Sequence, residues 1–219
     1  MAMKTPTKTR SLFCFLFVPL AFMLIPGCVP VFSELQSART VGQNRIEIAP
    51  SFSSVHYSEE GETDGAQNHM GMQVAYGITP NIDVRARYEY LWTINDAFEE
   101  GVHIFGIGPK FGIVKDKIAF YAPIGRALGE DYKDSWQLHP TLLLTLPVMR
   151  DKIDITLSPK YLLLFCEDCD DLIAINLGLS FSTNLHKWAI RPEYGLLFDP
   201  GESGYYGHFS IGLSTTFGL

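Results

Sequence analysis

The sequence lacks any long hydrophobic run outside its N-terminal region, which excludes helical membrane spans of roughly 18 or more apolar residues. Charged residues are also few, at 19%, and acids outnumber bases by 24 to 17. An acidic chain argues against nucleic-acid binding, and 47% hydrophobic residues are too many for a disordered chain. A membrane-like composition without membrane helices favours a transmembrane β-barrel, and 219 residues suit one such domain.

Residues 1–27 have the features of a bacterial export signal. Three basic residues precede an apolar core over 12–25, which is too short to span a bilayer. The core ends in Ile25-Pro26-Gly27-Cys28, which resembles a lipobox, the motif whose Cys receives acyl chains. We therefore expect lipidation at Cys28. The alternative is ordinary signal-peptidase cleavage, which leaves Cys28 as a plain thiol.

From residue 45 onward the chain alternates apolar and polar residues, the period-2 pattern of half-buried strands. Residues 28–44 lack this pattern, and we expect a periplasmic lead or tether, a short helix or a partial plug. The pattern over 45–219 predicts an all-β fold, an antiparallel up-and-down barrel of about ten strands. The predicted strands lie near 45–55, 69–79, 81–93, 102–114, 117–127, 135–148, 152–165, 172–183, 187–198 and 205–218.

The connections between these strands alternate in length and in charge. Short turns alternate with longer links at 56–68, 94–101, 128–134, 166–171 and 199–204. Outer-membrane barrels have short periplasmic turns and long external loops, and ten strands give four of the former and five of the latter. The long links carry 16 of the 24 acidic residues, whereas basic residues gather at the short turns. The two ends of the barrel are therefore expected to differ in charge.

The polar face of the strands indicates which face is inside. It is rich in Gly, Ser and Thr rather than in Lys and Glu, which suits a confined lumen better than a solvated exterior. A soluble, lipid-anchored barrel or sandwich is the alternative. Six prolines lie inside the predicted strands, where each removes a hydrogen-bond donor. They are Pro50, Pro109, Pro123, Pro140, Pro159 and Pro192.

The architecture of residues 28–219 resembles that of bacterial outer-membrane β-barrel proteins. Residues 35–42 are similar to the lead-in of lipobox-bearing envelope proteins, and 213–219 resemble a C-terminal assembly signal with Leu213, Thr215 and Phe217 alternating. Such signals usually end on an aromatic residue, whereas Gly218 and Leu219 follow here. The resemblance implies the outer membrane of a Gram-negative bacterium, with membrane lipid and the barrel-assembly machinery as partners.

The polar face also carries charged side chains that we expect to line the lumen. Mixed charges in a narrow barrel predict either a salt-bridged core that holds the barrel rigid or a constriction that selects small ions or solutes. The residues of this candidate constriction are Asp83, Arg85, Arg87, Glu89, Lys110, Asp154, Lys160, Arg191 and Glu193.

The link at 166–171 contains Cys166 and Cys169, separated by two residues. In an oxidising compartment this spacing predicts a small disulfide, with free thiols or a metal as alternatives. No second ligand pair completes a zinc motif, so we expect no metal site. The acidic links are most simply a solvated rim.

We therefore expect a non-enzymatic envelope barrel, either a small-solute or ion channel or a structural protein. A surface adhesin acting through the acidic links is the alternative. Motifs for nucleophilic hydrolysis, phosphate binding and zinc proteases are missing, and no cofactor is expected. Some ten-stranded outer-membrane barrels are rim proteases, and the residues nearest to that pattern are His103, His208, Asp96 and Asp199.

Overall fold

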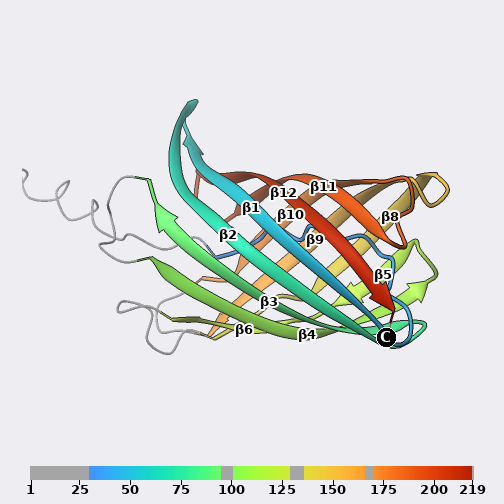
Figure 1. Ribbon diagram of the computed structural model, residues 1–219. Helices are drawn as coiled ribbons and strands as arrows, with labels where there is room; N and C mark the ends of the chain where they lie inside the picture. Colours follow the sequence, from blue (N-terminus) through green and yellow to red (C-terminus); the bar gives the residue numbers. More distant parts are fainter. Residues whose placement is uncertain (1–29, 95–100, 129–135, 166–169, 219) are drawn as a thin grey trace, which may run out of the picture.

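The computed structural model describes residues 30–94, 101–128, 136–165 and 170–218, which form a closed antiparallel β-barrel (Figure 1). The strands are β1 Arg45–Glu59, β2 Glu62–Thr79, β3 Ile82–Thr93, β4 Val102–Val114, β5 Ile118–Tyr121, β6 Ile124–Leu128, β7 Trp136–Leu138, β8 Thr141–Met149, β9 Ile153–Phe165, β10 Leu172–Phe181, β11 Trp188–Phe198 and β12 Tyr205–Gly218. Among these residues, no helix is long and apolar enough to cross a membrane.

The twelve strands make ten spans of the wall, which confirms the predicted barrel. Strands pair with their neighbours in sequence, and β12 pairs with β1 to close the wall. One span consists of β5 and β6, both paired with β4, and the next consists of β8 and β7, both paired with β9. The observed strand bounds lie within a few residues of the predicted ones, except in the first hairpin.

Prolines explain the two interrupted spans. Pro123 lies between β5 and β6, and Pro140 lies between β7 and β8, where a missing N–H breaks the ladder. The wall stays continuous because the carbonyl of Pro123 accepts from the His139 N–H at 3.0 Å, and that of Pro140 accepts from Tyr161 at 3.1 Å. The other four prolines that lie inside predicted strands are accommodated within β1, β4, β9 and β11.

The barrel has two different ends. At the turn end lie the first residue of β1, the last of β12 and the connections 80–81, 115–117, 150–152 and 182–187. Asp116 and Asp151 have φ values of 59° and 56° there, the left-handed conformation that tight turns need. At the opposite, loop end lie the ends of the strands that flank 60–61, 94–101, 129–135, 166–171 and 199–204.

The first hairpin differs from the sequence prediction. Most of the expected link at 56–68 is strand, since β1 and β2 continue to a two-residue turn at Glu60 and Gly61, both with positive φ. A bulge between Val55 and His56 separates this extension from the rest of β1. The extended hairpin projects beyond the other strands (Figure 1). Its polar residues gave no apolar alternation, so the sequence pattern could not predict it.

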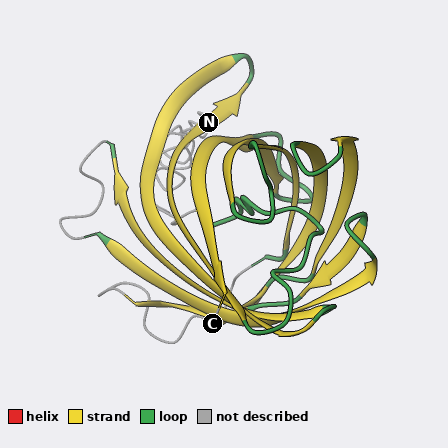
Figure 2. Cartoon of the chain, turned by 45° about the vertical axis from the view of Figure 1, so that its right-hand side comes forward, coloured by secondary structure: helices red, strands yellow, loops and turns green. Residues whose placement is uncertain are grey.

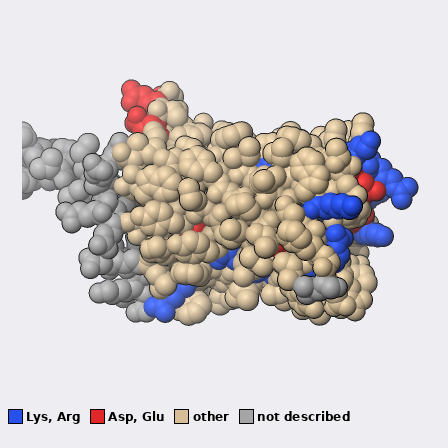
Figure 3. All heavy atoms as spheres, in the orientation of Figure 1, with Lys and Arg blue, Asp and Glu red and all other residues tan. Residues whose placement is uncertain are grey.

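The wall is apolar outside and polar inside. Along β10, outward Ile175 and Leu177 are 45% and 53% exposed, whereas inward Ala174 and Asn176 are fully buried. Figure 3 shows a broad uncharged belt, with Lys and Arg gathered mainly at the turn end and acidic side chains at the tip of the β1–β2 hairpin. An apolar exterior around a polar interior is the arrangement of a transmembrane barrel rather than of a soluble one.

Candidate functional site

The lumen contains residues 30–44, which we call the strap. Figure 2 shows this chain inside the ring of strands. Residues 30–39 are buried or nearly so, and the segment contains no helix. The described part of the segment therefore lies inside the wall, the position that a plug would have, and the roles considered for residues 28–44 stay predictions.

The strap runs from the loop end to the turn end. Val31 packs against a cluster of wall residues that lie near the loop-end termini of their strands, namely Leu91, Val102, Ile104 and Ala127. At the other extreme, the Val41 N–H donates to Asp83 at the start of β3, and Thr40 donates to the carbonyl of Pro80 at 2.7 Å. The strap therefore crosses the whole lumen before it joins β1.

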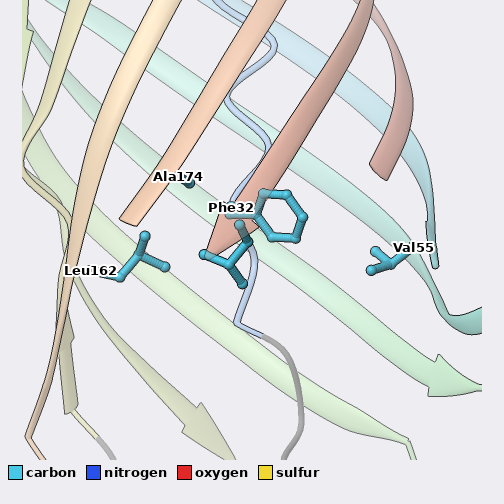
Figure 4. Packing of buried hydrophobic residues seen from close by; sticks show 5 residues of the cluster. Phe32, Val55, Leu162 and Ala174 are labelled. Atoms are coloured by element: carbon cyan, nitrogen blue, oxygen red, sulfur yellow. The ribbon is translucent and has the colours of Figure 1, made fainter. Parts of the chain in front are cut away.

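An apolar cluster surrounds the strap near the loop end. Phe32 points toward Val55, Leu162 and Ala174 from three different strands (Figure 4). Its ring also lies edge-on to that of His208, with centroids 4.5 Å apart. Phe32 and Leu162 are 1% and 0% exposed, so this cluster closes the lumen around the strap.

Acidic and hydroxyl side chains of the wall accept hydrogen bonds from the strap backbone. The Glu193 carboxylate accepts from the N–H groups of Glu34 at 2.6 Å and Leu35 at 2.8 Å. The Thr145 hydroxyl accepts from the Ala38 N–H at 2.8 Å. These bonds satisfy donors of an extended segment that has no strand partner of its own.

Basic side chains bind the carbonyls of the same segment. Lys160 donates to the carbonyl of Phe32 at 3.0 Å, and Arg191 donates to that of Leu35 at 3.1 Å. Lys110 donates to the carbonyls of Ser37 and Arg39 at 2.6 and 2.7 Å, and Arg87 donates to that of Ser33 at 2.6 Å. Charged wall groups thus hold the strap mainly through its backbone.

Two charged strap residues add ion pairs near opposite ends. Glu34 pairs with Lys160 at 2.5 Å, and both side chains are 1% exposed. Arg39 pairs at the turn end with Asp154 at 2.6 Å, Asp151 at 3.0 Å and Asp116 at 3.5 Å. Desolvation raises the pKa of Asp151, but the charges of His186 and Arg39 outweigh it, so the pKa is below its usual value.

The remaining wall charges pair with one another. Glu47 accepts from Arg85 at 3.0 Å and from Arg191 at 2.8 Å, while Arg85 also lies 3.5 Å from Asp83. Arg87 and Glu89 pair at 2.8 Å. Buried charges need such partners because an unpaired ion in a low-dielectric interior is costly.

The nine residues of the candidate constriction all face the lumen, where Arg87 is partly exposed and the others are buried. They do not form one ring, because they divide between the wall network and the strap contacts. The sequence pattern missed Glu34 and Arg39, which complete the charge pairing. Both residues lie in a segment without apolar–polar alternation, so the sequence contained no indication that they face the lumen. Selection of ions by the nine residues stays a prediction.

The structure separates the candidate protease residues. His103 lies on the outer face of β4, where its ring contacts the hydroxyl of Tyr88 at 2.9 Å. His208 is buried in the lumen between Ser210 and Asn176. Asp199 follows β11 at the loop end, and Asp96 lies outside the described residues. Where the chain is described, no group of three His, Cys, Asp or Glu side chains is placed to hold a metal.

The cysteine predictions concern residues that the structure does not describe. Cys28, Cys166 and Cys169 all lie outside the described ranges, so lipidation and the disulfide stay predictions.

Comparisons with known proteins find likeness of fold alone. No family model matches the sequence, and no curated protein matches it. Among solved structures, an outer-membrane channel from Pseudomonas putida is 7% identical, with 80% of this chain and 96% of that chain covered and a TM-score of 0.49. The translocator domain of the autotransporter NalP from Neisseria meningitidis is 9% identical, with 80% and 89% covered and a TM-score of 0.46.

A third solved structure is Ail, the attachment invasion locus protein of Yersinia pestis. It is 14% identical to this chain, with 80% of this chain and 99% of that chain covered and a TM-score of 0.37. Likeness at this level supports no argument about function. The chain is therefore similar in fold to outer-membrane barrels whose printed descriptions differ widely.

Proposed function

We propose that this chain is a non-enzymatic outer-membrane barrel with a closed lumen, which serves as a structural or surface-presenting envelope protein. Residues 1–27 are the export signal, and 28–219 form the mature protein, inserted by the barrel-assembly machinery. The apolar belt supports contact with membrane lipid. An even number of spans, with both ends of the wall at the turn end, supports a periplasmic turn end and an external loop end.

The proposal of a closed lumen rests on the position of the strap. The strap occupies the interior from end to end, and most of the charged side chains around it are buried and bonded to the strap or to one another. Lys110, Asp83 and Asp154 are each 0% exposed, which is not expected of side chains lining an open aqueous pore. Passage of ions would require the strap to leave or the charge pairs to break.

Single-channel conductance in a planar bilayer tests this proposal. We expect the refolded mature barrel to insert without conducting and a variant lacking residues 30–42 to conduct in discrete steps. A heat-dependent gel shift verifies that each variant is folded. Discrete steps from the wild-type barrel would instead identify an ion or solute channel. Reversal of charge at Arg85 or Arg87 should then change its selectivity, and unchanged selectivity would remove these residues from the conduction path.

The extended β1–β2 hairpin favours adhesion as a second candidate function. Its tip carries Glu59, Glu60 and Glu62, and Ser203 from the neighbouring connection donates to Glu59 at 2.6 Å. Tyr57 and Tyr206 pack with ring centroids 4.8 Å apart and support its base. Removing residues 57–64 should abolish binding of whole cells to a basic surface while the barrel stays folded. Binding that persists would exclude the hairpin.

A further inference from the structure

We infer that the barrel carries its own N terminus through the lumen to the cell surface, so that Cys28 and any acyl chains on it lie at the external face. This inference rests on the proposed orientation, with the loop end outside. It reverses the simple expectation for a lipid-anchored barrel, in which the anchored residue and the start of the wall lie on the same side of the membrane.

The first step is the position of the two strap ends. Val31 packs among residues at the loop-end termini of β3, β4 and β6. The Asn44 N–H donates to the carbonyl of Gly77 at 2.9 Å, at the turn end of β2. The chain therefore enters the wall at the turn end. The residues before Pro30 are joined to the other end of the strap, which lies at the loop end.

The second step is that the contacts fix this direction. Glu193 requires two N–H donors, which Glu34 and Leu35 supply, whereas Lys110 requires the carbonyls of Ser37 and Arg39. A reversed strap would place carbonyls and N–H groups at different positions along the lumen. It would also move Arg39 away from the acidic group at the turn end.

The third step is reach. A fully extended chain spans at most about 3.3–3.6 Å per residue, so the ten steps from Val31 to Val41 can cross at most about 33–36 Å. This exceeds the apolar band of an outer-membrane barrel, which is about 25 Å tall. Cys28 precedes Pro30 by only two positions, so the chain between them can span at most about 7 Å. Cys28 cannot return to the turn end from there.

The fourth step is that the lumen offers no way back. Phe32 and its apolar cluster are buried in the loop-end part of the interior, and the strap and buried charged side chains occupy the lumen toward the turn end. A second pass of chain would have to displace these buried groups. An acyl chain on Cys28 would consequently enter the membrane from the external side, over the rim of the barrel.

An epitope inserted between Val29 and Pro30 tests the inference in intact cells. One control carries the same epitope after Gly201, in the loop-end connection 199–204, and a second carries it after Lys115, in a turn-end connection. We expect antibody to label the first two variants before permeabilisation and the third only afterwards. Labelling after Gly201 without labelling before Pro30 would overturn the inference and leave the orientation intact. A silent Gly201 control in a folded barrel would overturn the orientation itself.

A smaller probe covers the case in which the epitope disturbs folding. Val29→Cys is placed in a background where Cys28, Cys166 and Cys169 are changed to Ser, and a membrane-impermeant maleimide is applied to intact cells. The Gly201→Cys variant of the same background reports a surface position. We expect both variants to react before permeabilisation. Reaction at Gly201→Cys alone, or reaction of Val29→Cys only after permeabilisation, would contradict the inference.

Discussion

At the residue scale, Arg39 connects the strap to three wall carboxylates at the turn end. Its partner Asp154 is fully buried and receives two hydrogen bonds from the Arg39 guanidinium, at 2.6 and 3.1 Å. Removal of one partner leaves the other charge buried without compensation. Measured losses of this kind are about 3–5 kcal/mol.

Arg39→Ala is therefore expected to lower the free energy of unfolding by roughly that amount, about 3–5 kcal/mol. Urea unfolding in detergent, followed by the heat-dependent gel shift, measures the change. Arg150→Ala is the matched control. Arg150 also pairs with Asp151, at 3.7 Å, but its side chain is 95% exposed and it lies outside the strap. Equal effects of the two substitutions would mean that the ion pairs of Arg39 add nothing to barrel stability.

The lowered pKa of Asp151 predicts a dependence of stability on pH. A carboxyl whose pKa is lower when folded stabilises the protein above its unfolded pKa, which is about 3.9 for Asp, and loses that effect as the pH falls through the folded value. The stability that Asp151 adds relative to Asp151→Asn should be present at about pH 5 and should disappear in stronger acid. A difference that persists at pH 2 would contradict the pairing with His186 and Arg39.

At the element scale, the junction of strap and wall depends on two glycines. Gly42 has a φ of 90°, and a Cβ at Gly77 would collide with the backbone of Gly42. Gly77 thus permits the strap to pass directly over β2, where Asn44 bonds to its carbonyl.

Gly77→Ala should lower the free energy of unfolding by about 1–3 kcal/mol, as overpacking does elsewhere. Gly106→Ala is the control, since its Cβ would lie 3.7 Å from the carbonyl oxygen of Ile124, an ordinary contact. Urea unfolding compares the two variants. If Gly77→Ala is as stable as Gly106→Ala, the close approach of the strap is not required.

How much the sequence could predict differs between elements. Alternation predicted the spans because each one lies between lipid and a polar lumen, as β10 illustrates. It failed for the β1–β2 extension, where residues 59–65 are all exposed and no apolar period exists. It also failed for the strap, because many of its contacts are made through backbone atoms, which impose no pattern on side chains. Such contacts can be seen only after the wall is closed around them.

At the scale of the whole molecule, the apolar belt determines where the barrel can reside. Leu177 is 53% exposed near the middle of β10, while Tyr205 is 36% exposed at the loop-end start of β12. A Lys on the lipid face costs about 2–4 kcal/mol at the bilayer midplane and about 0–1 kcal/mol near the interface.

Leu177→Lys should therefore destabilise the barrel in lipid by about 2–4 kcal/mol, and Tyr205→Lys by about 0–1 kcal/mol. Reversible unfolding in lipid vesicles measures both. Equal costs would mean that Leu177 does not face the hydrocarbon core, which would contradict the proposed membrane position.

The strap that crosses the lumen also constrains the order of assembly. Because the strap is buried and bonded to residues of several strands, we expect the seam between β12 and β1 to close around it during assembly. A folded domain fused ahead of Pro30 is too bulky to be drawn through the interior, so it would have to reach the loop end before the seam closes. Closure of the wall and placement of the strap are thus coupled steps of assembly.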